Sequence, residues 1–265
     1  MSTGTPVTIE VSGGVAHVAL NRPDKRNALD SATIAALGAA LQQCANDPKV
    51  RVLSLTGAGN VFCAGADLAE MQAQALASEE QNLAHAEKLA NLLGALDSFS
   101  KPTLARVNGD GYGGALGLIA ACDIVIVAEG ARFAFTEVRL GIIPAVVSPF
   151  VLGKISESAA RRYFLTAETI GAETLKEVGL AHEVVAADAL DAACSRVSEA
   201  ILKGAPGALS EAKVLIREVA HAAAHARADA SLRMAARLAR LRVREEAQEG
   251  FAAFFAKRKP TWRPD

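Results

Sequence analysis

The sequence has few cysteines, few aromatic residues and almost no net charge. Its four cysteines, Cys44, Cys63, Cys122 and Cys194, are dispersed among 265 residues and form no CxxC pair and no zinc-ligand spacing. This pattern argues against a disulfide scaffold or a structural metal, and it favours a reducing, cytoplasmic location. The formal net charge of −1 argues against a chain built as a whole to attract a polyanion.

Long apolar runs and targeting signals are also missing. No uninterrupted apolar run reaches the roughly 20 residues that a membrane helix needs. The N-terminal stretch MSTGTPVTIEV has neither a basic start nor an apolar signal core. We therefore expect no membrane partner. The hydrophobic content of 51% is enough for one large domain, or for a domain with an appendage.

Strand-like and helix-like patterns alternate along most of the chain, which indicates an α/β core. Strands are expected within residues 7–20 (a hairpin around Ser-Gly-Gly), 50–57, 101–109 and, in two pieces, 123–143. Helices are expected over 29–47, 79–99, 157–166 and 170–179, the first capped by Asp30 or Ser31.

The C-terminal part is helical in pattern and basic. From Pro206 onward almost everything reads as helix, and residues 203–265 carry 13 Lys and Arg against 7 Asp and Glu. A nucleic-acid surface is one interpretation. No aromatic residues interleave with the arginines between positions 217 and 244, so we favour a solvated basic face and expect no nucleic-acid partner.

Glycines at positions 109, 111 and 114 have the spacing of a dinucleotide-binding loop. The helix that would follow is short and contains Gly117, which weakens that interpretation. A second turn of small residues, FCAGADL at 62–68, has no role in a dinucleotide domain. Two strand-to-helix turns of small residues could present two backbone N–H groups to one point, which is the design of an oxyanion hole.

Five blocks of sequence together resemble the enoyl-CoA hydratase/isomerase (crotonase) family. They are NRPDKRNAL, VRVLSLTGAGNVFCAGADL, the stretch from KPTLARVNGDGYGGALG to LGIIPA, RRYFLTAETIGAETLKEVGLAHEVV and EGFAAFFAKRKPTW. The match runs from Val7 to Trp262. The resemblance implies a spiral of ββα units over residues 1–203, and a helical trimerisation region over 204–265. It also implies a homotrimer or a hexamer.

The resemblance also implies the site. The backbone N–H groups of Ala66 and Gly114 would form the oxyanion hole, and Glu137 would be the catalytic carboxylate. An acyl-CoA would be the substrate, with no further cofactor and no metal. The residues implied to contact its CoA part are Lys25, Arg26, Ala28, Ala64, Asp67 and Leu68, together with Phe254 and Lys257 from a neighbouring subunit.

The chain departs from the usual hydratase at Gly117, which stands where the family has its first glutamate. Glu137 would then be the one carboxylate in the matching positions, handling both proton transfers through the water. This departure, with TEVRLG and RRYFLTAE, resembles the branch that hydrates 3-substituted glutaconyl-CoA thioesters, whose substituent is methyl or isohexenyl.

We expect Gly117 to leave room beside C3 of such a substrate, and small residues such as Ala145 incline us slightly to isohexenyl. If the segment is a strand, Arg139 shares a face with Glu137 and is a candidate partner for the distal carboxylate. A Δ3,Δ2-enoyl-CoA isomerase remains an alternative, since it also manages with one carboxylate. A non-catalytic RNA-binding homologue is an alternative of another class.

Overall fold

The computed structural model describes residues 4–220 and, further along, residues 245, 249, 252, 253, 256 and 258–261. The chain divides into two compact units. One comprises residues 1–99 and 103–195, and the other comprises 100–102 and 196–265. The expected boundary after residue 203 stays a prediction.

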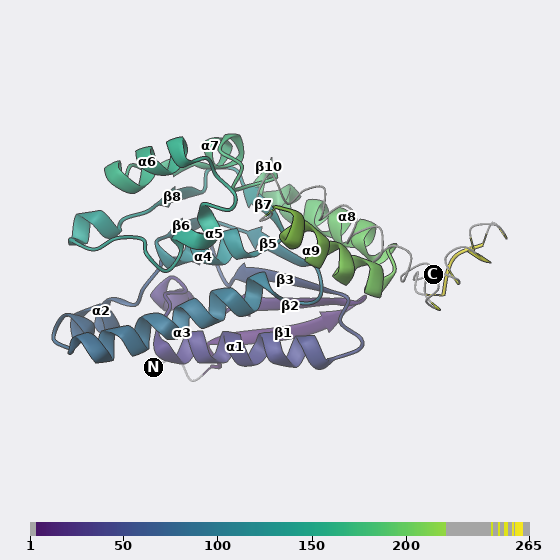
Figure 1. Ribbon diagram of the computed structural model, residues 1–265, viewed down its shortest axis with the longest axis horizontal. Coiled ribbons are helices and arrows are strands. Elements are labelled where there is room, and N and C mark those ends of the chain that lie inside the picture. Colours follow the sequence, from purple (N-terminus) through teal and green to yellow (C-terminus); the bar gives the residue numbers. More distant parts are fainter. Residues whose placement is uncertain are drawn as a thin grey trace. The chain divides into compact units, whose positions relative to one another are not determined.

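Two sheets form the framework of the first unit (Figure 1). The larger has the strand order β1-β2-β3-β5-β7-β10, with bounds Val7–Ser12, Val15–Leu20, Val52–Gly57, Thr103–Val107, Ile124–Ala128 and Glu183–Val185. The smaller has the order β4-β6-β8-β9, with bounds Val61–Cys63, Asp110–Tyr112, Arg132–Ala134 and Ile170–Gly171. In the larger sheet β1 and β2 form the expected hairpin, and every later pairing is parallel.

The two sheets grow by a repeated unit. Successive pairs of strands, β3 with β4, β5 with β6 and β7 with β8, each give one strand to the larger sheet and the next to the smaller. Helices follow the first two pairs, α2 (Leu68–Ala75) and α3 (Glu79–Asp97) after β4, and α4 (Gly114–Ala121) after β6. This is the expected spiral of ββα units.

Helix α1 (Ser31–Asn46) packs against β1, β2 and α3, while α3 also packs against α4 (Figure 1). Asp30 caps α1 by accepting a hydrogen bond from the Thr33 N–H at 2.7 Å, as its side chain type predicts. Ser78 and Gln81 form a reciprocal capping box at the start of α3. These caps fix where both helices begin.

The core lies in and around the larger sheet. β3 and β7 read as nearly continuous apolar runs, VLSLTG and IVIVA, and most of their side chains are buried. Strands buried on both faces need such runs, whereas a half-exposed strand would alternate. Asp123 holds the end of this core by accepting hydrogen bonds from the Thr103 N–H at 2.7 Å and its hydroxyl at 3.0 Å.

The remaining described elements extend the chain from the core. They are η1 (Pro23–Lys25), η2 (Glu137–Leu140), α5 (Ser148–Val151), α6 (Glu157–Thr166), α7 (Ala172–Glu177), η3 (Ala187–Ala189), α8 (Leu190–Leu202) and α9 (Pro206–Ala220). In the second unit, the buried Lys213 of α9 donates to the Lys101 carbonyl at 3.0 Å. None of the described helices is long and apolar enough to cross a bilayer.

One expected element is wrong. The second strand-like piece ends at Ala134, and residues 137–140 form the 3-10 helix η2, which Gly141 terminates in a left-handed conformation at φ 73°. A strand side chain two positions on shares a face, but a 3-10 helix repeats every three residues, so Arg139 and Glu137 point in different directions. Arg139 is exposed, and it does not line the cavity described below.

Candidate active site

Two strand-to-helix turns of small residues lie side by side. One runs from β4 to α2, and the other runs from β6 to α4. β4 and β6 are parallel neighbours, with Val61 paired to Asp110 and Cys63 to Gly111, so both turns leave the small sheet at the same edge. Gly65 shows how closely they approach, because a Cβ there would lie 2.6 Å from the Tyr112 carbonyl oxygen. Both predicted N–H donors stand in these turns.

The N–H of Ala66 is left unused by the bridge that holds its turn. Leu29 forms an isolated parallel bridge with Ala66, in which the Leu29 N–H donates to the Gly65 carbonyl and the Asp67 N–H to the Leu29 carbonyl, at 2.7 and 3.1 Å. A parallel bridge uses the groups on either side of the bridged residue, so the N–H of Ala66 faces away from Leu29. It is therefore available to a ligand.

The second donor opens α4. Gly114 is the first residue of this helix, so its N–H has no acceptor within the helix. The preceding Gly113 has φ 51°, a left-handed value that suits glycine. A Cβ on Gly114 would lie 3.3 Å from the Leu29 Cδ1, which puts Leu29 beside both turns.

Glu137 faces the second turn. A Cβ on Gly113 would lie 3.3 Å from the Glu137 Oε1, and the other carboxyl oxygen, Oε2, is buried without a hydrogen-bond partner among the described residues. Burial raises the pKa of Glu137 above its ordinary value, and a backbone hydrogen bond offsets part of the effect. A carboxyl group with one buried oxygen free of hydrogen bonds to the described residues, and with a raised pKa, is typical of a proton-transfer site.

Ala66, Gly114 and Glu137 line one cavity of about 680 Å³. Its other lining residues come from the α1 region, from α2 and α3, and from the segment after Glu137: Leu29, Ile34, Met71, Gln74, Asn82, His85, Ala86, Leu89, Leu140, Ile142, Ile143, Pro144, Ala145, Val146 and Val147. Two backbone donors and one carboxyl group at a mainly apolar cavity can hold a developing oxyanion and move a proton.

The space expected beside Gly117 is filled. Gly117 is buried in α4, and a Cβ there would lie 2.7 Å from the Val147 Cγ1 and 2.8 Å from the Leu93 Cδ1. Gly117 is not among the residues that line the cavity. The prediction that its lack of a side chain leaves room for a substrate branch is therefore wrong, because neighbouring side chains occupy that room.

Several residues expected to contact CoA lie close to the first turn. The Ala64 N–H donates to the Arg26 carbonyl at 2.9 Å, which joins the 25–28 turn to the 63–67 turn. The exposed Arg26 guanidinium lies 3.9 Å from the Asp110 carboxylate. Lys25 and Leu68 are exposed, whereas Ala28 is buried. Phe254 and Lys257 lie outside the described residues.

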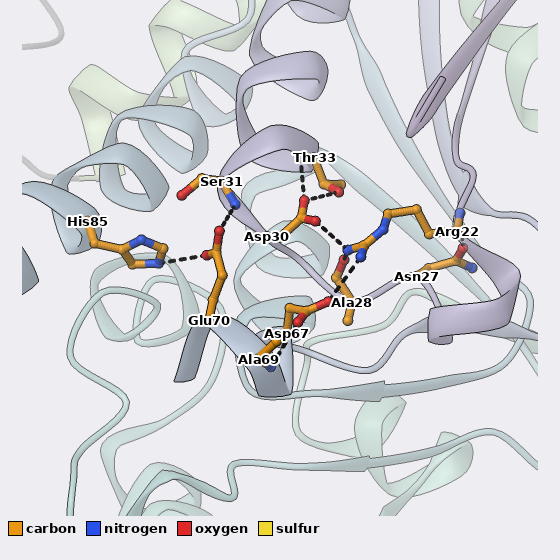
Figure 2. Close-up of polar contacts among 10 residues, drawn as sticks. All are labelled: Arg22, Asn27, Ala28, Asp30, Ser31, Thr33, Asp67, Ala69, Glu70 and His85. Atoms are coloured by element: carbon orange, nitrogen blue, oxygen red, sulfur yellow. Dashed lines mark hydrogen bonds and ion pairs between the residues drawn. The ribbon is translucent and has the colours of Figure 1, made fainter. Parts of the chain in front are cut away.

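The sequence analysis missed Arg22, which holds the first turn in place (Figure 2). Its guanidinium pairs with Asp30 at 2.9 Å and with Asp67 at 3.0 Å, and it donates to the Ala28 carbonyl at 2.9 Å. Burial alone would raise the pKa of Asp67, but hydrogen bonds from the Ala69 N–H and Arg22 outweigh this and lower it. The Asp67 carboxylate therefore stabilises the turn, and its contact with CoA stays a prediction.

The buried Asn27 completes this support. Its side chain oxygen accepts from the Arg22 N–H at 3.0 Å, and its amide nitrogen donates to the carbonyls of Ala58 and Val61 at 2.9 and 2.8 Å. The one signal in the sequence was the polar cluster NRPDKRNALD. Nothing local in that cluster indicates Asp67, since the Arg22–Asp67 pair spans 45 positions.

A comparison with known proteins agrees with this geometry. The sequence profile described as "Enoyl-CoA hydratase/isomerase" matches residues 10–265. The chain belongs to the enoyl-CoA hydratase/isomerase family. It is accordingly an enzyme of the hydro-lyase type with the crotonase fold, and enoyl-CoA hydratase-type activity on CoA thioesters is what its relatives support.

Three members of this family illustrate the likeness. The 2,3-dehydroadipyl-CoA hydratase of Escherichia coli K12 is 32% identical over 245 residues, covering 92% of this chain and 93% of that protein. The mevalonyl-coenzyme A hydratase sidH of Aspergillus fumigatus is 33% identical over 274 residues, covering 100% and 99%. The crystal structure of an enoyl-CoA hydratase from Shewanella pealeana has a TM-score of 0.92 and 41% identity, covering 97% and 96%.

Proposed function

We propose that this hydratase adds water across the C2=C3 bond of a 3-substituted glutaconyl-CoA, with Glu137 as its single catalytic carboxylate. The observation that carries the proposal is the position of Glu137. Its carboxyl group faces the Gly113–Gly114 turn, and its Oε2 is buried without a hydrogen-bond partner among the described residues, in a cavity that both Ala66 and Gly114 line.

The proposed reaction uses Glu137 twice, as base and then as acid, and the two backbone N–H groups together. The Glu137 carboxylate accepts a proton from a water molecule while the water oxygen bonds to C3. The electron pair of the double bond moves towards the thioester, whose oxygen becomes an enolate held by the N–H groups of Ala66 and Gly114. Glu137 then returns the proton to C2. The net change is the addition of one water, and the 3-hydroxy thioester is a tertiary alcohol.

The relatives' names support the substrate class. Dehydroadipyl-CoA has a free carboxylate at the far end of its acyl chain, and mevalonyl-CoA has a methyl group and a hydroxyl at C3. A 3-substituted glutaconyl-CoA has both a free carboxylate at the far end of its acyl chain and a branch at C3. Since the space beside Gly117 is filled, the branch would lie against the wall of residues 142–147, where Ala145 is the small residue. Isohexenylglutaconyl-CoA and 3-methylglutaconyl-CoA are the two candidates.

The rest of the assembly is part of the same proposal. The CoA part would lie along Lys25, Arg26, Ala28, Ala64 and Leu68, with Asp67 acting through its turn. Phe254 and Lys257 of a neighbouring subunit would complete the CoA site in a homotrimer or hexamer. The reaction would need no cofactor beyond the CoA of the substrate.

The test is a hydration assay with a panel of enoyl-CoA thioesters: 3-methylglutaconyl, isohexenylglutaconyl, glutaconyl and crotonyl. The wild type should convert the 3-substituted glutaconyl substrates with the highest kcat/KM. Glu137→Gln keeps the shape of the side chain but cannot accept a proton, so kcat should fall by roughly 10²–10⁴ while the thioesters still bind.

Mass spectrometry of the product separates the alternatives. A gain of one water identifies a hydratase, whereas an unchanged mass with a shifted double bond would identify an isomerase. Full activity of a folded Glu137→Gln variant would remove Glu137 from the mechanism. The non-catalytic alternative predicts a different result. The wild type and Glu137→Gln would both bind RNA in a salt-dependent way, and neither would turn over any of the thioesters.

A further inference from the structure

One wall of the cavity carries a histidine that the proposed chemistry does not use. Within the described part of the chain, His85 of α3 is the one cavity-lining side chain that can carry a positive charge, and Glu137 is the one acidic side chain. The lining residues between positions 140 and 147 are apolar. A polar side chain placed in a mainly apolar cavity is a feature that selects ligands.

The carboxylate of Glu70 lies beside this histidine (Figure 2). The Glu70 Oε1 accepts a hydrogen bond from the Ser31 N–H at 2.7 Å, so the start of α1 anchors the carboxylate. Its Oε2 is buried without a hydrogen bond to the described residues, and it lies 3.7 Å from the His85 Nε2. The imidazole therefore has the Glu70 carboxylate beside its Nε2, while the side chain as a whole lines the cavity.

The other polar residues on this wall are less suited to an anion. The Asn82 side chain nitrogen already donates to the carbonyls of Gln74 and Ala77, at 3.0 and 3.3 Å, and so serves the turn between α2 and α3. Gln74 is neutral. Arg139, the candidate from the sequence, does not line the cavity.

His85 lies on the same face of α3 as a residue that adjoins the second turn. It precedes Leu89 by four residues, about 6 Å along the helix axis. The Leu89 Cδ2 would lie 3.7 Å from a Cβ on Gly114, so Leu89 adjoins the second oxyanion donor. In a glutaconyl thioester the free carboxylate is two carbons beyond C3, which is a few ångströms.

We propose that His85 binds the distal carboxylate of the acyl group, so that the site selects CoA thioesters of dicarboxylic acids. The proposal rests on the proposed function and names the residue that recognises the distal carboxylate of its substrate. An ion pair inside the cavity would favour a carboxylate-bearing acyl chain over an apolar chain of the same shape.

The experiment measures binding of two unreactive thioesters to the full chain by calorimetry. Glutaryl-CoA ends in a carboxylate, and 5-methylhexanoyl-CoA replaces that carboxylate with an isopropyl group of the same shape. The wild type should bind glutaryl-CoA more tightly. His85→Leu should reduce the ratio of the two affinities by roughly 10- to 100-fold, which is the value of a hydrogen bond to a charged group.

Two further variants make the result specific. His17 is exposed on β2 and does not line the cavity, so His17→Leu should leave the ratio unchanged. His85→Gln keeps a planar polar side chain without charge, and it should lose several-fold of the preference while retaining the fold.

Each outcome has a separate meaning. If the wild type prefers glutaryl-CoA and His85→Leu keeps that preference, His85 does not bind the distal carboxylate, and the proposed substrate class stands. If the wild type has no preference, the selection of dicarboxylic thioesters fails, but hydration by Glu137 is tested separately by the enoyl-CoA panel.

Discussion

Glu137 occupies an environment that suits the proton transfer proposed for it and that costs stability. Its carboxyl group has one buried oxygen without a hydrogen bond to the described residues, and burial raises its pKa. The group therefore holds its proton to a higher pH in the folded protein than in the unfolded chain, where it ionises at its ordinary pKa. Ionisation at neutral pH costs folding free energy, as is common at catalytic sites.

This predicts a pH-dependent gain of stability in Glu137→Gln. Between the ordinary and the raised pKa, the folded state binds more protons than the unfolded state, so wild-type stability falls as pH rises through that window. Above the window the penalty is complete, and glutamine avoids it. The variant should therefore have a higher Tm than the wild type above the window, and the difference should shrink as pH falls below it. Thermal unfolding measured across pH checks this, and a constant Tm difference would contradict it.

At the residue scale, the sequence could identify the candidate site residues but not the residues that hold them in position. Ala66, Gly114 and Glu137 were predicted, because small-residue turns and a carboxylate in a family motif are local patterns, and the structure brings all three to one cavity. Arg22 and His85 were missed. Their importance comes from partners on other elements, Asp67 for the first and Glu70 for the second, and side chain pairing of this kind leaves no local pattern.

At the scale of elements, most expectations hold because the patterns are regular. The opening hairpin, α1, α3, β3, β5 and β7 lie where apolar periodicity and caps place them. Residues 137–143 differ because EVRLGII alternates like a strand, but Gly141 adopts a left-handed φ and the Ile142 N–H donates back to the Glu137 carbonyl at 3.2 Å. This turn returns the chain to the cavity, and alternation of residue types does not reveal it.

Packing of α4 gives a prediction about Gly117. In Gly117→Ala the new Cβ would overlap Val147 and Leu93, and overpacking of this kind costs about 1–3 kcal/mol, more than the helix propensity of alanine returns. In a Val147→Ala background the clash with Cγ1 is gone, so the same substitution should cost at least about 1 kcal/mol less. Denaturant unfolding of the double-mutant cycle measures the coupling.

Gly94 provides the matched control, since it lies in α3 and a Cβ there would meet nothing within 4 Å. Gly94→Ala should stabilise the protein by about 0.5–1 kcal/mol. Equal effects at both glycines would contradict the packing argument. The same contacts mean that Gly117→Glu alone cannot restore the two-glutamate pattern, because Val147 occupies the space that the side chain would need.

At the scale of the whole molecule, the fold was predictable because five blocks of sequence resemble the family in the same order. The trimeric or hexameric assembly stays a prediction. The proposed sharing of Lys257 between subunits can be tested by mixing two defective variants. Lys257→Ala should raise the KM for CoA thioesters, and Glu137→Gln should abolish turnover. In mixed oligomers, some sites combine Glu137 of one chain with Lys257 of the other, so a fraction of the activity should return with the wild-type KM.

The control is the same mixture without subunit exchange, which should behave as the sum of the two parents. A co-expressed mixture that also behaves as that sum, in particles shown by light scattering to be mixed trimers or hexamers, would mean that each subunit binds CoA alone. A monomeric wild type would reject the proposed assembly directly.

The bridge between Leu29 and Ala66 has a consequence for how the enzyme folds. The donor at Ala66 is held by contacts that span much of the N-terminal region, the Leu29 bridge and the Arg22–Asp67 pair, rather than by its own loop. Closing so long a loop costs entropy before any contact repays it. The proposed oxyanion hole can therefore form only once the segment after the hairpin, with Arg22 and Leu29, has met the turn after β4, so we expect the site to be completed late in folding, with the other long-range contacts.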